Sequence, residues 1–383
     1  MRHIKPFVAA APRYLCGAFA LLAVASACTE QPRQPPRATD TQSSAPPARD
    51  SQVAWTVRPI LNAPNYFVLS DWVDDATLWG LAGENPVDID SRTGAGTPWR
   101  IRAAGARRSP DRSALAWGDA SGIWIMHRGG RPRRLLTYAS LPQVPAGDPT
   151  NEIHWAPNGR RLLTSWRDEG NVTYALVDTL NGTLEPIATR LTGYGVASAQ
   201  LWLDDRRIIF SAPANAGKDG STDYRESGWR SDLMVHDIGT HTYEKVTDVP
   251  DGVFLSIAGA FGDTLLVIRR SSGENLATFP LIETRTWQEA PSGLDRGTGV
   301  AVTKDGARAA IFRSDDVMSE VILRSRRSGL PHGAPVLLPG RISGAAWSPN
   351  GRALAVSTMA EEPVAGSPND RRSRYRLSVL ESP

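Results

Sequence analysis

From residue 53 onwards, the apolar positions fall into short strand-like runs separated by turns rich in Pro, Asp, Asn and Gly. Residues 154–163 read HWAPNGRRLL, and residues 346–355 read AWSPNGRALA. In both copies an apolar residue precedes the turn and an apolar run follows it, which is the pattern of two antiparallel strands joined by a tight turn. Two copies this similar indicate an internal repeat.

Weaker copies become visible when the Trp of this unit is used as a reference column. The column comprises Trp72, Arg108, Trp155, Trp202, Gly259, Val302 and Trp347. A second column, seven residues later, is apolar throughout and comprises Trp79, Leu115, Leu162, Ile209, Leu266, Ala309 and Leu354. A repeat of about 46 residues with strand-like content is the size of one four-stranded propeller blade.

The sequence therefore predicts an all-β, seven-bladed β-propeller of four-stranded antiparallel sheets. Six units contain a candidate outer strand, whereas the chain given ends after the third strand of the seventh unit, Tyr375–Glu381. The β-rich segment Val53–Leu61 is expected to supply the missing strand by pairing with Tyr375–Glu381, which would close the ring. Six blades remain an alternative, because the fifth copy, near Gly259, is weak.

Residues 1–27 are expected to be a lipoprotein signal peptide, and residues 28–52 a disordered tether before the propeller at 53–383. Basic residues precede an apolar stretch from Tyr14 to Ala27, and small residues lie directly before Cys28. This ending resembles a bacterial lipobox, which implies lipidation of Cys28 and attachment to the outer face of the cell membrane. The alternative is an ordinary signal peptide and a secreted protein. The Pro/Ser/Thr-rich composition of the tether does not favour ordered structure.

The charge balance argues against a nucleic-acid partner. The chain has 43 basic and 40 acidic residues. Arg2, Lys5 and Arg13 are the only charged side chains before Cys28, so the remainder is balanced at 40 and 40. A balanced chain has no large field of one sign to attract nucleic acid. We expect no nucleic-acid partner, no cofactor and a monomeric protein.

The Trp-Ser-Pro-Asn-Gly-Arg-x-Leu-Ala pattern at Trp347 resembles the WD-like repeat of the TolB propeller family. The resemblance covers residues 53–383 and implies a propeller with this turn between the first and second strands of each blade. The chain differs from that family in having the tether where an α/β domain stands, so the family's partners do not carry over. Together these features suggest a TolB-like lipoprotein of an actinobacterial envelope.

Several residues have the types found in metal or catalytic sites, but their places in the repeat favour structural roles. His236, Asp237, His241 and Glu244 have metal-ligand types, but the repeat places them in a solvated hairpin. The recurring Asp and Arg of the turns are interpreted as turn chemistry, and the recurring Trp as core between blades. The sequence shows no nucleophile, base and acid in a recognisable arrangement, so we expect no metal site, no catalytic residue and no enzymatic activity.

Two insertions remain as candidate binding elements. The connection between the second and third strands is long in the fourth unit (Ser211–Ser231) and in the seventh (Thr358–Arg374), and both should emerge on one face. Their candidate contact residues are Tyr224, Arg225, Trp229, Arg230, Arg371, Arg372 and Arg374. We therefore expect a non-enzymatic scaffold that binds an envelope or secreted protein. The alternative is an envelope propeller that binds a carbohydrate or small ligand, or hydrolyses one, in its central channel.

Overall fold

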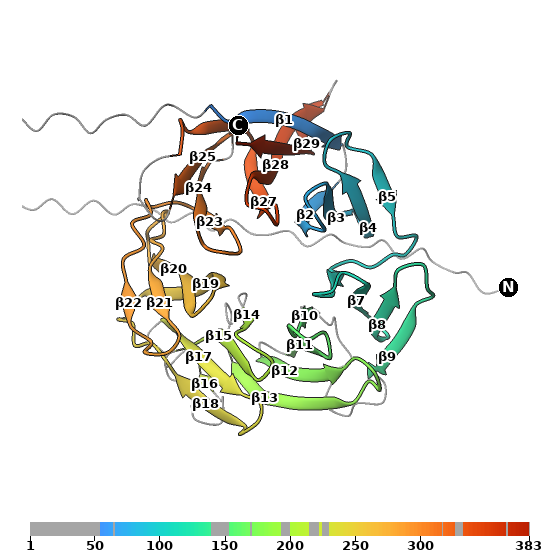
Figure 1. Ribbon diagram of the computed structural model, residues 1–383, viewed down its shortest axis with the longest axis vertical. Helices are drawn as coiled ribbons and strands as arrows, with labels where there is room; N and C mark the ends of the chain where they lie inside the picture. Colours follow the sequence, from blue (N-terminus) through green and yellow to red (C-terminus); the bar gives the residue numbers. More distant parts are fainter. Residues whose placement is uncertain are drawn as a thin grey trace, which may run out of the picture. The chain divides into compact units, whose positions relative to one another are not determined.

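Six hydrogen-bonded sheets form the part of the chain that the computed structural model describes, and they make a ring of seven blades (Figure 1). The eight-stranded sheet comprises two blades, which one parallel pair, Ser231 with Phe254, joins. The structure describes residues 54–382, apart from 64–65, 139–152, 169–170, 193–199, 214–221, 224–229, 316, 326–331 and 365–366. The described residues contain strands but no α-helix, and thus no helix that could span a membrane. The predicted all-β propeller is confirmed.

The first four blades follow the order expected from the repeat, with neighbouring strands antiparallel. Blade 1 comprises β2 (Phe67–Trp72), β3 (Thr77–Ala82), β4 (Asn85–Asp90) and β5 (Gly96–Pro98). Blade 2 comprises β6 (Arg107–Arg108), β7 (Ala114–Asp119), β8 (Gly122–His127) and β9 (Arg133–Thr137). Blade 3 comprises β10 (Ile153–Trp155), β11 (Arg161–Asp168), β12 (Asn171–Asp178) and β13 (Leu184–Thr192), with the short β16 (Thr222–Asp223) parallel to β13. Blade 4 comprises β14 (Gln200–Trp202), β15 (Arg207–Pro213), β17 (Ser231–Asp237) and β18 (Thr242–Lys245).

The remaining blades complete the ring. Blade 5 comprises β19 (Val253–Phe261), β20 (Thr264–Ser271), β21 (Leu281–Glu283) and β22 (Glu289–Ala290). Blade 6 comprises β23 (Gly299–Val302), β24 (Arg308–Ser314), β25 (Met318–Ser325) and β26 (Val336–Pro339). Blade 7 comprises β27 (Arg341–Trp347), β28 (Ala353–Val364), β29 (Ser367–Glu381) and β1 (Thr56–Ala63). The seventh blade thus joins the two ends of the folded region.

The predicted closure of the ring is confirmed. Strand β1 pairs antiparallel with β29, with Thr56 opposite Glu381 and Ala63 opposite Tyr375. Figure 1 shows β1 along the outer side of β29. The Arg58 guanidinium also donates to the Glu381 carboxylate across this pair. A strand from one end of the chain therefore covers an edge that the other end would leave unpaired.

The core between the blades is built from the two repeated columns. All seven side chains of the second column are at most 2% exposed. In the first column, the Trp indoles donate to a main-chain carbonyl of the preceding blade, for example Trp72 Nε1 to Ala346 O at 2.8 Å and Trp347 Nε1 to Ala301 O at 3.1 Å. The recurring Trp residues therefore link neighbouring inner strands, as predicted.

The repeated turn residues also act as predicted. Asp204 accepts hydrogen bonds from the backbone N–H groups of Arg206 and Arg207, both at 2.8 Å. The turns additionally touch one another, since Asp205 of blade 4 accepts the N–H of Asn158 of blade 3 at 3.0 Å. Gly159 has a φ of 71°, a left-handed conformation that explains the Gly of the turn motif.

Candidate functional site

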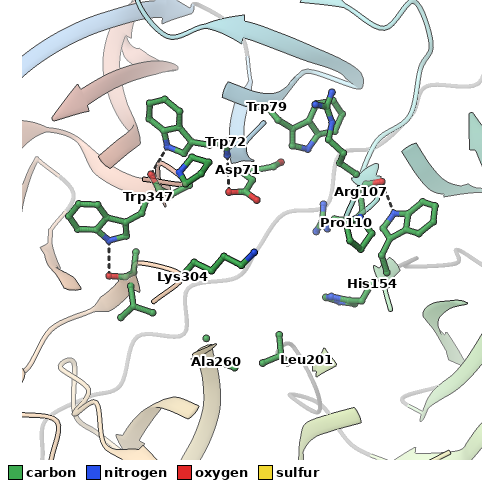
Figure 2. Close-up of a pocket in the computed structure, with 18 of the residues that line it drawn as sticks. Asp71, Trp72, Trp79, Arg107, Pro110, His154, Leu201, Ala260, Lys304 and Trp347 are labelled. Atoms are coloured by element: carbon green, nitrogen blue, oxygen red, sulfur yellow. Dashed lines mark hydrogen bonds between the residues drawn. The ribbon is translucent and has the colours of Figure 1, made fainter. Parts of the chain in front are cut away.

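The seven inner strands end around a central cavity of about 890 Å³. Residues of every blade line it, chiefly those at the ends of the inner strands and in the turns that follow (Figure 2). Because the second strand of a blade runs away from this turn, the connections between second and third strands lie toward the opposite face. The cavity is therefore a site separate from the insertions.

The cavity is not lined by aliphatic side chains alone. Figure 2 shows Asp71, His154 and Lys304 pointing into it from blades 1, 3 and 6. Arg107 and Arg112 of blade 2 also line it. Within the described ranges, the side chains of Lys304 and Arg112 have neither an ion-pair nor a hydrogen-bond partner. Two cations are thus available to a ligand, beside one carboxylate and one imidazole.

The surroundings of Asp71 change its acidity. The Asp71 side chain is exposed toward the cavity, but the ring of blades surrounds it. This burial raises the pKa of Asp71 above its ordinary 3.8, while the Trp72 N–H and the charges of Arg112, Arg108 and Lys304 act in the opposite direction. The Trp72 N–H donates to Asp71 Oδ1 at 2.8 Å. Asp71 is therefore held in place and is a better proton acceptor than a free Asp.

His154 responds in the opposite direction. Burial lowers the pKa of its imidazole to about 4, and the charge of Arg107 adds to this effect. His154 is consequently neutral at pH 7 and presents one N–H donor and one N acceptor to the cavity.

A buried ion pair supports blade 2 behind the cavity. Arg108 Nη2 lies 2.6 Å from Asp88 Oδ1, and the two side chains are 8% and 6% exposed. The Arg108 guanidinium carbon is 5.0 Å from the ring centre of Trp79 and 5.1 Å from that of Trp99. These contacts hold Arg108 between blades 1 and 2. Arg107 and Arg112, which line the cavity, lie close to Arg108 in the sequence of blade 2.

The seventh-unit insertion differs from the prediction. Residues 358–374 were expected to form a loop, but β28 and β29 extend as a hairpin in which Glu362 lies opposite Arg372. Arg374 Nη1 contacts Glu362 Oε2 at 3.3 Å, whereas Arg371 and Arg372 are exposed. Cross-strand pairs of opposite charge stabilise this polar hairpin. Its composition alone had indicated an irregular loop.

The fourth-unit insertion is described only at its ends. Tyr224, Arg225 and Trp229 lie outside the described residues. Arg230 donates to Val249 O at 3.0 Å and lies 3.6 Å from Asp251, so part of its guanidinium stabilises its own blade. Protein binding through these residues stays a prediction.

The hairpin with metal-ligand types is only partly as expected. Asp237 caps the turn by accepting the N–H groups of Gly239 and Thr240. His236, however, is 2% exposed and packs on Tyr243, with ring centres 4.3 Å apart. Burial lowers its pKa to about 4. Because the His236 side chain is buried against Tyr243, the expectation of a wholly solvated hairpin is wrong.

Sequence reasoning missed the cavity residues. Asp71, Arg107 and His154 each directly precede a residue of the first column, where other blades have Leu201, Ala301 or Ala346. The sequence did contain a signal for these cavity residues: they are polar at a repeat position that is apolar in the other blades.

The comparisons identify enzymes with a similar fold. An oligogalacturonate lyase solved in complex with manganese has a TM-score of 0.59 and 13% identity, over 87% of this chain and 98% of that chain. An oligogalacturonate lyase from Vibrio parahaemolyticus has a TM-score of 0.57 and 9% identity, over 86% and 98%. No protein-family model and no curated protein matches the chain. At these identities the likeness establishes the fold alone.

These neighbours correct one expectation. The chain was expected not to be an enzyme, because no catalytic arrangement is recognisable along the sequence. The solved neighbours overturn this reasoning, since lyases share the fold and the fold therefore does not exclude catalysis. A propeller assembles its site from separate blades, so spacing along the chain carries little information about it. Membership of the TolB family stays a prediction.

Proposed function

We propose that this chain is an exported β-propeller whose central cavity binds an acidic sugar, meaning a sugar that carries carboxylate groups. The observation that supports this most directly is the convergence of Lys304 and Arg112, two cations without a partner among the described residues, on one cavity with Asp71 and His154. Lys and Arg bind carboxylates, while carboxylate and imidazole groups hydrogen-bond to hydroxyls. A ligand with both groups matches this set.

The solved neighbours support the same ligand class. Both are oligogalacturonate lyases, and oligogalacturonate is a chain of carboxylated sugars. The central cavity lies within the range of about 300–1,000 Å³ typical of small-ligand sites. Its charged lining residues are one carboxylate and four cations, and this excess of positive charge is consistent with an acidic sugar.

A manganese ion, which accompanies one of the neighbours, does not fit the residues of this cavity. Asp71 and His154 are its carboxylate and imidazole groups, and Lys304, Arg107 and Arg112 place positive charge around them. Within the described residues, no group of three or more His, Cys, Asp or Glu could hold a metal.

Acid–base cleavage of the bound sugar is a second candidate function. Burial raises the pKa of Asp71 and lowers that of His154, and such opposed shifts are typical of catalytic pairs. In an elimination, Asp71 would accept the proton from the carbon beside the sugar carboxylate, whose charge Lys304 offsets. The electron pair of the broken C–H bond would form the new double bond, and the glycosidic oxygen would leave with its bonding electrons. The oxygen would take a proton from solvent water, and Asp71 would return its proton to the solvent. Ultraviolet absorbance of an unsaturated product would reveal this reaction.

Replacing Lys304 tests the binding function. We expect Lys304→Met to weaken the binding of digalacturonate about 10- to 100-fold, because one charge-assisted contact is worth about 1.5–3 kcal/mol. Isothermal titration measures the change. Arg352→Met is the matched control: Arg352 is exposed in the corresponding turn of blade 7 but does not line the cavity. Equal losses in both variants, or no binding by the unaltered protein, would contradict the proposal.

The membrane attachment of the protein is part of the proposal. It rests on the small residues before Cys28 in the sequence, a position outside the described residues. We expect Cys28→Ala to abolish incorporation of labelled palmitate and to shift the protein from the membrane fraction to the soluble fraction. An unchanged distribution would instead favour the ordinary signal peptide.

A further inference from the structure

A second groove opens beside the central cavity, between blades 2 and 3. Its volume is about 410 Å³, and its lining includes Asp111, His127, Arg133 and Arg160. The groove and the cavity share four lining residues: Ser109, Pro110, Trp155 and Pro157. Because Trp155 lines both, the groove and the cavity lie side by side at this side chain. We refer to the cavity, Trp155 and the groove together as the path.

Trp155 is a fixed platform at this junction. Its side chain is half-buried and packs against the core between blades 2 and 3. The indole Nε1 donates to Arg107 O at 3.0 Å, which sets the orientation of the ring. Aromatic side chains present large rigid surfaces to ligands at little cost in conformational entropy. A sugar ring can pack on this surface while its substituents reach the polar groups on either side.

The charges around the path favour a polyanion. Blade 2, from Arg107 to Thr137, contains seven Arg and only two acidic residues, Asp111 and Asp119, although the chain beyond residue 27 is balanced overall. Asp111 is engaged within its own turn, accepting from Ser109 Oγ at 2.6 Å and Ser113 Oγ at 2.8 Å. Positive charge is therefore concentrated on the blade that borders both the cavity and the groove.

The far side of the groove carries two Arg side chains, Arg133 and Arg160. Arg133 donates to Leu180 O at 3.1 Å and to Thr179 O at 2.8 Å, which ties the outer strand of blade 2 to blade 3. Arg160 is exposed on the opposite wall, and its guanidinium has no partner among the residues that the structure describes. One Arg thus fixes the groove, and another is available for an anion.

We propose that the ligand is a chain of acidic sugars that runs from the central cavity across Trp155 into the groove between blades 2 and 3. This inference rests on the proposed binding of an acidic sugar and adds the length and direction of the ligand. Successive carboxylates along one chain would meet Lys304 and Arg112 in the cavity and Arg160 in the groove. A single sugar would fill only part of this path.

A chain-length series tests the inference. Isothermal titration of the full protein with di-, tetra- and hexagalacturonate should show about tenfold tighter binding of the hexamer than of the dimer, because the groove adds a charge-assisted contact. Arg160→Met should remove this gain and leave dimer binding unchanged. Lys304→Met should weaken all lengths, and Arg352→Met should weaken none.

Other binding results would contradict the extended path, the groove, the ligand class or the proposed function. Equal affinity for all lengths in the unaltered protein would refute the extended path and leave the acidic-sugar function standing. A hexamer gain that persists in Arg160→Met would also refute this groove. Binding of a single-stranded oligonucleotide of equal charge as tightly as the hexamer would refute a sugar chain as the ligand. Absence of binding at every length would refute the proposed function itself.

Discussion

Asp88→Ala is expected to destabilise the propeller by about 3–5 kcal/mol, because removing one partner of a buried ion pair leaves the other charge uncompensated. The remaining Arg108 would keep its contacts with Trp79 and Trp99, but its Nε and Nη1 already lack hydrogen-bond partners in the described structure. The nearby Arg128, 3.5 Å from Asp88 and largely exposed, would add a second unpaired positive charge. Urea denaturation followed by Trp fluorescence measures the loss.

Two further variants separate the buried pair from ordinary surface charge. Glu84→Ala removes an exposed pair with Arg102, at 3.8 Å, and should cost less than about 1 kcal/mol. Combining Asp88→Leu with Arg108→Met should recover most of the stability lost in Asp88→Ala, since apolar side chains of similar size can replace a buried pair. A cost below 1 kcal/mol for Asp88→Ala would show that this pair does not hold blades 1 and 2 together.

The ring itself could be predicted because its signals are local. The turn Pro157-Asn158-Gly159 and its copy in blade 7 place a left-handed Gly and a capping Asn at fixed positions, and each turn forms from its own residues. The apolar second column could be found in the same way, because it lies seven residues after the first column in every repeat. Closure by β1 was accessible for a related reason, since an unassigned strand at one end matched a missing strand at the other.

A site in the central channel was one alternative drawn from the sequence, but its charged lining residues were not identified, because they come together only after the ring has closed. Asp71, Arg112, His154 and Lys304 come from four separate blades, and each is an unremarkable polar residue beside a turn in its own repeat. Their altered environment depends on distances across the ring, which a single sequence does not contain. The hairpin of β28 and β29 was missed for another reason: its cross-strand pairs replace the apolar alternation that normally indicates strands.

Removing residues 54–63 is expected to lower the free energy of unfolding by an amount on the order of 5 kcal/mol. The loss comes from apolar side chains of the core that become exposed, each of which contributes about 1.5–3 kcal/mol when fully buried. Trp55 is 9% exposed in the core shared by blades 6 and 7, and Ile60 and Leu61 pack against the core of blades 7 and 1. Thermal unfolding of the shortened protein should begin at a lower temperature and become less cooperative.

Addition of the missing strand in trans provides the decisive measurement. A peptide of residues 54–63 can pair with the exposed edge of β29, because strand addition requires only a free edge and matching side chains. We expect the peptide to restore the cooperative transition in a concentration-dependent manner, and a scrambled peptide of the same composition to have no effect. Equal stability of the shortened and complete proteins would show that β27, β28 and β29 close the ring without β1. Rescue would instead establish that the register from Thr56–Glu381 to Ala63–Tyr375 determines closure, and with it the cavity that the inner strands enclose.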